Sequence, residues 1–213
     1  MKTKHILSLT FALFVAFTAC KKDNDPTEDP KTEEPNTVEP KIEESKAIVK
    51  TDILVESPTA LKQADTWPEI FYDLDAQKSS ATKSGQVIFT GGFNLNLAVT
   101  DFDTYKLGMF NDVNKNIEDI TFEYLKTAQI AYYTEPLGLE YNGSIGWYGY
   151  NMTTHKPSAI EGRFAIIYKG ESLEKAEKIY VIKPTSIGYI TIDATAKTYK
   201  GQVNFGVKIY TKQ

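Results

Sequence analysis

Hydrophobic and polar residues alternate along two stretches of this chain, in the period-two pattern of a β-strand that buries one face. The alternating apolar residues are Phe93, Leu95, Leu97 and Val99 in the first stretch and Val203, Phe205, Val207 and Ile209 in the second. Successive side chains of a strand point to opposite faces of a sheet, so the pattern predicts half-buried antiparallel strands. The core is expected to contain Phe93, Leu95, Leu97, Val203, Phe205 and Val207.

Other apolar runs predict further strands, whereas helical patterns are rare. Strand-like runs cover residues 53–55, 69–74, 86–90, 93–99, 105–110, 129–133, 144–152, 162–168, 178–182, 189–193 and 202–210. Turn-forming pairs separate them, and Lys183-Pro184 is one such pair. Residues 116–127 are expected to hold at most a turn or two of helix. The sequence therefore predicts an all-β fold with mostly antiparallel strands, as one β-rich ligand-binding domain over residues 51–213.

The N-terminal region has the layout of an export signal. Lys2 and Lys4 precede an apolar run, and the run ends in small residues before Cys20, the only cysteine. The run is too short for a membrane span, so residues 1–19 are predicted to be a signal peptide. Phe17-Thr18-Ala19-Cys20 resembles a bacterial lipobox. We therefore expect Cys20 to be acylated, which also removes an unpaired thiol from an exported protein.

Residues 20–50 carry four prolines and many acidic side chains but few apolar ones. A segment of this composition cannot bury enough apolar surface to offset the conformational entropy that ordering would cost. We expect an acidic, proline-rich linker between Cys20 and a folded domain that begins near Thr51. Its first residues, Lys-Lys-Asp-Asn-Asp, resemble the acidic surface-export signal of Bacteroidota lipoproteins.

The charge balance argues against one class of partner. The chain holds 24 basic and 28 acidic side chains, for a formal net charge of -4. Removal of Lys2 and Lys4 with the signal peptide lowers this charge to about -6. Nucleic-acid binding depends on a basic surface, so we expect no nucleic-acid partner.

Motifs of catalysis are scarce, and we expect no enzymatic activity. The mature chain has one histidine, His155, which is predicted to lie in a surface turn. Residues 142–146 lack the first glycine of a nucleophile elbow, G-x-S-x-G. Zinc needs three or four histidine, cysteine or carboxylate ligands that converge on one point, so we expect no zinc site. Residues 112–123 are spaced like a calcium loop, but Ile117 stands where that loop needs glycine, so a polar turn is the better interpretation.

Residues 146–155, Gly-Trp-Tyr-Gly-Tyr-Asn-Met-Thr-Thr-His, combine aromatic and metal-ligating side chains. As a strand, this stretch would place Tyr148, Tyr150 and Met152 on one face and Trp147 on the other. Two tyrosines and a thioether form a flat, soft wall that suits a planar ligand, and methionine can ligate haem iron axially. The alternative interpretation is core packing, because sulfur packs well against aromatic rings.

The lipobox, the acidic linker and the β-rich domain around this stretch resemble the HmuY-like haem-binding lipoproteins of Bacteroidota. The resemblance covers Trp67 to the C-terminus and is clearest over residues 144–183. It implies a mostly-β fold that holds haem at the cell surface and passes it to a TonB-dependent outer-membrane receptor. In this family the second axial ligand follows the Gly-Trp tryptophan by five residues, a position that corresponds to Met152.

The resemblance leaves the other axial ligand open. The family's upstream histidine or methionine has no counterpart in residues 128–145, and Met109 is the only other methionine of the mature chain. Met152 and Met109 are therefore the axial-ligand candidates. The candidate haem-pocket residues are Trp147, Tyr148, Tyr150 and His155. Haem is the cofactor expected, and no metal other than haem iron is expected.

Two functional hypotheses follow. In the first, the protein is a lipid-anchored outer-membrane protein, exposed at the cell surface, that binds haem in iron acquisition. In the second, a surface lipoprotein of the same fold binds a glycan or a protein partner and not haem, because exposed aromatic rings also stack on sugars. Titration with haem separates the two hypotheses.

Overall fold

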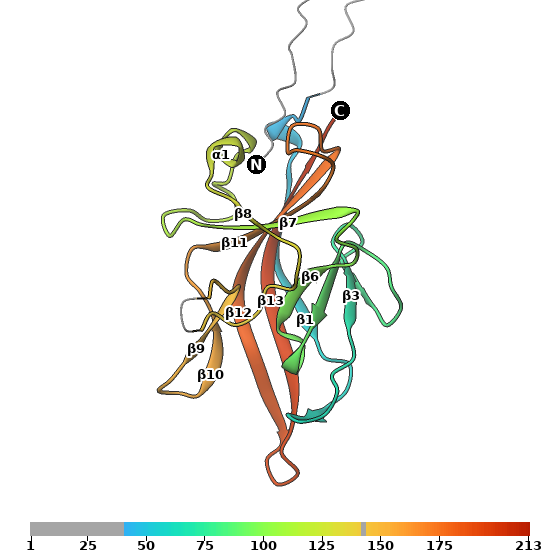
Figure 1. The fold of residues 1–213 in the computed structure, drawn as a ribbon, viewed down its shortest axis with the longest axis vertical. Helices are drawn as coiled ribbons and strands as arrows, with labels where there is room; N and C mark the ends of the chain where they lie inside the picture. The colour runs from blue at the N-terminus through green and yellow to red at the C-terminus, as the bar shows by residue number, and fades with distance from the viewer. Residues whose placement is uncertain (1–40, 142–143) are drawn as a thin grey trace, which may run out of the picture. The chain divides into compact units, whose positions relative to one another are not determined.

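The computed structural model describes residues 41–141 and 144–213 of the chain. β-Strands dominate this part (Figure 1), so the predicted all-β fold is confirmed. The one α-helix among the described residues is α1 (Phe122–Thr127), within the stretch expected to hold a turn or two of helix. Thr121 caps it, because its hydroxyl oxygen accepts a hydrogen bond from the Tyr124 amide at 3.0 Å. No helix in the described ranges is long and apolar enough to cross a membrane.

A seven-stranded antiparallel sheet is the main sheet of the domain. Its strands lie in the order β1-β13-β12-β11-β7-β8, and β2 also pairs with β13. Their bounds are β1 (Ile48–Glu56), β2 (Leu61–Lys62), β7 (Tyr105–Asn111), β8 (Ala131–Tyr133), β11 (Arg163–Lys169), β12 (Lys178–Asp193) and β13 (Thr198–Thr211). The two longest strands, β12 and β13, form one hairpin. Its turn lies at the end of the domain opposite the C-terminus in Figure 1.

Two smaller antiparallel sheets complete the fold. One has the order β4-β3-β5-β6, and the other is the hairpin of β9 and β10. Their bounds are β3 (Ile70–Asp73), β4 (Lys78–Ser80), β5 (Val87–Thr90), β6 (Asn96–Val99), β9 (Tyr148–Asn151) and β10 (Lys156–Ala159). The sequence patterns miss β2, β4 and β10, because these strands are short and hold few apolar residues.

The larger hydrophobic cluster joins the main sheet to the four-stranded sheet. Phe205 of β13 meets Tyr72 of β3 and Phe89 of β5, with ring centroids 5.8 Å apart in both pairs. Five of the six predicted core residues belong to this cluster, each with at most 1% of its surface exposed. They are Leu95, Leu97, Val203, Phe205 and Val207. Truncation of such a phenylalanine to alanine typically costs about 3–5 kcal/mol.

A second hydrophobic cluster, which includes Leu125 of α1, lies on the other face of the main sheet. β11 contributes to both clusters, since Ala165 and Ile167 lie in the first and Phe164 and Ile166 in the second. A strand that is buried on both faces reads as a continuous apolar run rather than an alternating one. This explains why the apolar pattern of β11 does not alternate.

β12 runs without a break through Lys183-Pro184, where the sequence indicates a turn. Its pairing with β13 shifts register between Pro184 and Ser186. Proline lacks the amide proton that a regular ladder needs, and a bulge is one of the few places where a strand accommodates it. The prediction of separate strands over 178–182 and 189–193 is therefore wrong, because both belong to one strand of 16 residues.

The folded domain begins before Thr51. A 3-10 turn, η1 (Glu44–Lys46), precedes β1, which starts at Ile48. The carboxylate of Glu44 accepts hydrogen bonds from Lys208 Nζ and from the Phe122 amide, both at 2.8 Å. The prediction that the linker extends to residue 50 is thus wrong for residues 41–50, which are docked on β13 and α1. The predicted signal peptide, Cys20 and the remaining linker lie outside the described residues.

Candidate functional site

The β9–β10 hairpin carries two of the candidate ligands at its turn. Its ladder runs from the Tyr148–Ala159 pair to the Asn151–Lys156 pair, and residues 152–155 connect the strands. Asn151 shapes the turn, because its side-chain oxygen accepts hydrogen bonds from the amides of residues 153 and 154 at 2.9 Å. His155 closes the turn with φ 54°, a left-handed conformation in which histidine is enriched. The prediction that His155 is a surface turn residue is confirmed.

Met152 and His155 are the first and last residues of this turn. In a β-turn the Cα atoms of these two positions lie within about 7 Å of each other. Met152 is 68% exposed and Tyr150 is 39% exposed. His155 is also exposed, and its ring centroid lies 6.3 Å from that of Tyr150. The hairpin therefore presents a thioether, an imidazole and a phenol ring to solvent at one end.

Trp147 and Tyr148 anchor the hairpin to the core instead. Trp147 precedes β9 and is fully buried, and its Nε1 donates a hydrogen bond to the Leu95 carbonyl oxygen at 2.8 Å. Tyr148 is 9% exposed and belongs to the larger hydrophobic cluster. Met152 lies beyond the end of β9. The predicted strand face shared by Tyr148, Tyr150 and Met152 is therefore wrong, because the strand ends at Asn151.

Met109 does not join Met152. It lies in β7 with 3% of its surface exposed, and its sulfur accepts a hydrogen bond from Arg163 Nη1 at 3.4 Å. The same nitrogen donates to the carbonyl oxygen of Gly146, before the start of β9. The four residues of β9 lie between Gly146 and Met152, and four residues of strand span roughly 13 Å. One iron cannot contact both sulfurs, so the prediction that Met109 pairs with Met152 is wrong.

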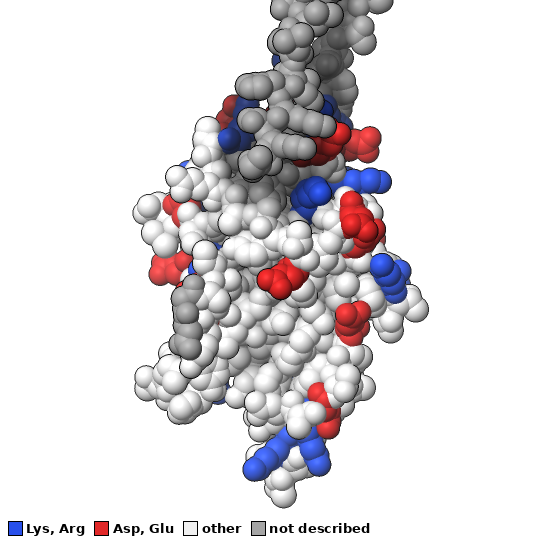
Figure 2. Space-filling view, viewed as in Figure 1, with Lys and Arg blue, Asp and Glu red and all other residues white. Residues whose placement is uncertain are grey.

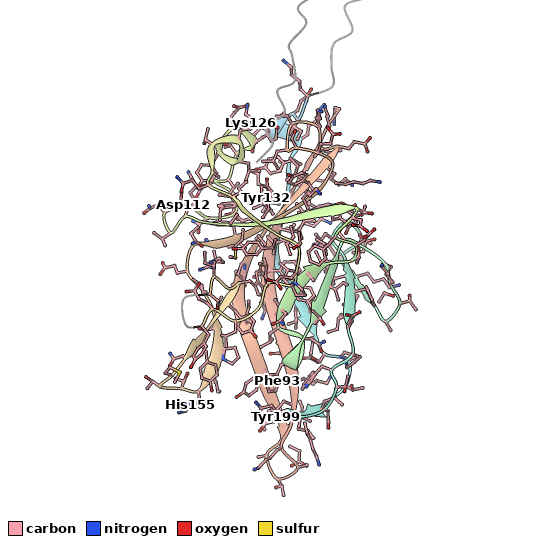
Figure 3. The ribbon with its side chains drawn as sticks, in the orientation of Figure 1. Phe93, Asp112, Lys126, Tyr132, His155 and Tyr199 are labelled. Carbon is pink, nitrogen blue, oxygen red and sulfur yellow. The ribbon has the colours of Figure 1, made fainter. Side chains whose placement is uncertain are left out.

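Four aromatic rings lie next to the hairpin, on β12, β13 and the segments that pack on them. Phe93 stacks on Tyr189 with ring centroids 4.5 Å apart, and Tyr199 meets Phe93 edge-on at 5.7 Å. Trp67 tilts against Phe93 at 5.1 Å. We call these four residues the aromatic group. The Tyr189 hydroxyl donates a hydrogen bond to the His155 carbonyl oxygen at 3.5 Å, which links the group to the turn of the β9–β10 hairpin. Figure 3 labels His155 at this turn and Phe93 and Tyr199 of the aromatic group.

Phe93 holds its place in the aromatic group with a strained backbone. Its φ is 60° and that of Asn94 is 55°, so these residues form a 3-10 turn, η2 (Gly92–Asn94), rather than the start of the predicted 93–99 strand. A left-handed phenylalanine costs roughly 1–3 kcal/mol. Gly201 gives the turn room, because a Cβ there would lie 1.5 Å from the Phe93 carbonyl oxygen. As a result Phe93 is only partly buried, contrary to the prediction that it is a core residue.

Asn94 fixes this turn through hydrogen bonds to three parts of the chain. It is 2% exposed, and its amide nitrogen donates to the carbonyl oxygens of Pro68 at 2.6 Å and Phe89 at 3.3 Å. Its amide oxygen accepts from the Ser57 hydroxyl at 3.0 Å, and the Ser57 oxygen accepts from the Gly201 amide at 3.0 Å. This buried network offsets the strain of Phe93 and holds its ring in a fixed position.

Two tyrosines near the β9–β10 hairpin, Tyr148 and Tyr189, have raised pKa values. Burial raises the pKa of Tyr148. Burial also raises the pKa of Tyr189, and the nearby phenols of Tyr150 and Tyr199 add smaller contributions. Neither residue therefore offers the phenolate that serves as an iron ligand in some haem proteins. The thioether of Met152 and the imidazole of His155 can bind a metal without ionising a phenol.

The calcium-like loop is explained by its own hydrogen bonds. Asp112 accepts from the Asn114 amide and from the Tyr124 hydroxyl, both at 2.9 Å. The ammonium of Lys183 donates to Asn116 Oδ1 at 3.1 Å. Over residues 41–141 and 144–213, no group of three or more histidine, cysteine, aspartate or glutamate residues is placed to hold a metal ion.

Sequence reasoning missed the aromatic group. Trp67, Phe93, Tyr189 and Tyr199 are far apart in the chain, and each reads as an ordinary strand or core residue. The Gly-Gly pair before Phe93 and Asn94 is a sequence signal for a turn. No sequence pattern shows which residues such a turn packs against. No protein-family model, no curated protein and no solved structure matches this chain.

Proposed function

We propose that this protein is a surface lipoprotein that binds haem at the turn of the β9–β10 hairpin. One observation carries the proposal. Met152 is the only exposed methionine of the described residues, and His155 is the only histidine there. These two residues stand at the ends of one exposed turn. Both residue types ligate haem iron axially. Tyr150 offers a flat ring beside the turn, with its centroid 6.3 Å from that of the His155 ring.

A single axial ligand from the protein fits this turn. Met152 and His155 stand at the two ends of one short exposed turn, and either side chain could hold the iron from there. We propose Met152 as that ligand, in agreement with the HmuY-like resemblance, and His155 as the alternative. A neutral thioether favours ferrous over ferric iron, because it is a soft ligand that does not offset the additional positive charge.

The cellular setting is proposed from the sequence. Cys20 follows a signal peptide and resembles a lipobox cysteine, so acylation would anchor the chain to the outer membrane. The acidic linker resembles a surface-export signal, and the family resemblance implies transfer of haem to a TonB-dependent receptor. In a Cys20→Ala variant the protein should no longer partition with membranes. Unchanged partitioning would contradict the lipid anchor.

Titration of the purified mature chain with haem tests the proposal. We expect a Soret band that saturates at one haem per chain, with tighter binding after reduction of the iron. Absence of binding in both redox states would contradict haem binding and would favour the second candidate function.

The second candidate is a surface lipoprotein that binds a glycan without haem. The aromatic group favours it, because Phe93 is held by a left-handed backbone beside the buried hydrogen bonds of Asn94. The rings of Phe93, Tyr189 and Tyr199 remain partly exposed, whereas Trp67 is buried. Phe93, Tyr189 and Tyr199 would stack on sugar rings, which needs no metal. The two candidates differ in their residues, so variants of one site need not affect the other.

A further inference from the structure

A surface cavity of about 300 Å³ lies where β2 meets the turn of the β12–β13 hairpin. One side is formed by Lys62, the last residue of β2, with residues 63 and 64, and the other by residues 195–197 of the turn between β12 and β13. Pairing of Lys62 with Thr198 and of Leu61 with Tyr199 joins the two sides. Ligand sites start at about this volume, and a cavity of this size suits one sugar ring rather than a larger cofactor.

Two lysines bring ammonium groups to the wall of this cavity, and two carboxylates lie close to it along the chain. Lys62 and Lys197 line it, and within the described part of the chain neither ammonium group has a carboxylate partner within 4.0 Å. The two nearest acidic residues along the chain are engaged by backbone amides. Asp65 accepts from the Lys62 amide at 2.7 Å, and Asp193 accepts from the amides of residues 195 and 196 at 2.8 Å. Figure 2 shows basic side chains at this end of the domain, with acidic side chains next to them.

Tyr199 connects the cavity to the aromatic group. It lines the cavity, and its ring meets Phe93 at 5.7 Å and Tyr189 at 5.2 Å, edge-on in both cases. Flat rings next to cationic groups match a ligand that has both an apolar face and an anionic substituent. Gln63 and Thr195 add polar side chains to the same cavity wall.

Two further observations indicate that these rings are fixed for a purpose other than core packing. Phe93 is held in a left-handed conformation, a kind of strain that collects at binding sites. Trp67 Nε1 is buried and has no hydrogen-bond partner among the described residues. Buried donors without a partner are rare in folded proteins.

We propose that this cavity binds an acidic sugar residue, of the hexuronate class, within a glycan chain. The carboxylate pairs with Lys62 and Lys197, and the ring of the same or the next sugar stacks on Tyr199 and its neighbours. The inference rests on the second candidate function and specifies its ligand class. It does not require haem binding, since none of the hairpin residues 148–159 lines the cavity.

Titration of the mature chain with trigalacturonate tests the inference, and the methyl-esterified trimer is the uncharged control. We expect the acidic trimer to bind and added salt to weaken it, because exposed charge pairs are screened. The ester should bind about tenfold more weakly if each lysine contributes a charge-assisted hydrogen bond.

Lys62→Gln and Lys197→Gln remove one charge each at nearly constant length and should give a similar loss. Lys106→Gln, an exposed position on β7, is the matched control and should bind normally.

Each other outcome overturns a defined part of the inference. Equal binding of the ester, or unchanged binding by both lysine variants, would contradict recognition of the carboxylate while leaving a glycan site in place. Failure of both trimers to bind would contradict the inference and, if other oligosaccharides also fail, the second candidate function itself. Met152→Ala should bind trigalacturonate normally, and a loss of binding in that variant would contradict the separation of the two sites.

Discussion

The two methionines of the domain show how far residue type determines a role. Both qualified as soft iron ligands on chemistry alone, and only position separates them. Met109 is buried beneath Arg163, whereas Met152 is exposed in a turn. No local pattern predicts this difference, because the burial of Met109 comes from β8 and β11, which pair with β7 only in the folded sheet.

Arg163 is a buried cation whose removal should destabilise the domain. Its guanidinium donates to the Gly146 carbonyl oxygen and, at 2.8 Å, to Glu140. Arg163→Met leaves that carbonyl without a partner, so we expect the free energy of unfolding to fall by about 1–3 kcal/mol. Urea denaturation measures it. Lys175→Met removes an exposed pair with Glu171 and is the control, with an expected change below about 0.5 kcal/mol. Equal effects of the two variants would contradict the role of Arg163.

Glu56 should make stability depend on pH in the acid range. Hydrogen bonds from Lys200 at 2.9 Å and Gln202 at 2.7 Å lower the pKa of its carboxyl. A lowered pKa stabilises the folded state above the unfolded value of about 4.3, and that contribution is lost as the pH falls through the folded value. Glu56→Gln should therefore be less stable than wild type at neutral pH, by less than about 1 kcal/mol. The difference should disappear in acid, and a difference that grows on acidification would contradict this account.

At the scale of elements, strand existence was easier to predict than strand limits. Alternating residues locate β6 and β13, but the strands predicted around Pro184 merge into β12, because a bulge accommodates the proline. The hairpin turn shows the same limit. Its histidine was expected in a turn, but Met152 was assigned to a strand face, since the sequence gives no sign that Asn151 ends β9 by bonding the next two amides.

The N-terminal segment should contribute more stability than a linker would. Glu44 is the partner of Lys208, a side chain that is only 7% exposed. In Glu44→Ala the lysine keeps its hydrogen bonds to the carbonyl oxygens of Glu118 and Ile120 but loses its counter-charge. We expect a loss of about 1–3 kcal/mol in the free energy of unfolding. Glu43→Ala removes an exposed pair with Lys46 and should change stability by less than about 0.5 kcal/mol.

Limited proteolysis gives a second test of the same segment. Because residues 41–50 are docked on the domain, the protected fragment should begin near residue 41. A stable fragment that begins at Thr51, with no loss of stability, would contradict the docking.

At the scale of the whole molecule, the sequence predicts the fold class but not how the sheets pack together. Residue periodicity gave an all-β domain and five of six core residues, because these depend on local burial. The assembly of three sheets and the aromatic group depend on contacts between distant strands, which a single sequence does not contain. The candidate haem site falls between these cases. Its histidine was expected in a turn, whereas the turn position of Met152 and the surfaces around it were not predicted.

Buried tyrosines should make the stability of the whole fold depend on pH in the alkaline range. Burial raises the pKa of Tyr72 to about 12, with a smaller contribution from Asp73, and it raises the pKa values of Tyr168, Tyr180 and Tyr210 as well. A raised pKa stabilises the folded state below the unfolded value of about 10, and this contribution is lost as the pH rises through the folded value. Phenolate absorbance of these residues should therefore appear together with the loss of the circular dichroism of the sheets. Titration of every tyrosine near pH 10 in a still folded protein would contradict the burial described.

The most direct test of the central claim compares two methionine variants in haem binding. Met152→Ala should weaken haem binding by about tenfold or more and shift the Soret and visible bands, because it removes the proposed axial ligand. Met109→Leu conserves volume in the core and should leave affinity and spectrum unchanged. Both variants should keep the circular dichroism of wild type. An unchanged spectrum and affinity in Met152→Ala, or a larger change in Met109→Leu, would contradict a haem site at the hairpin turn.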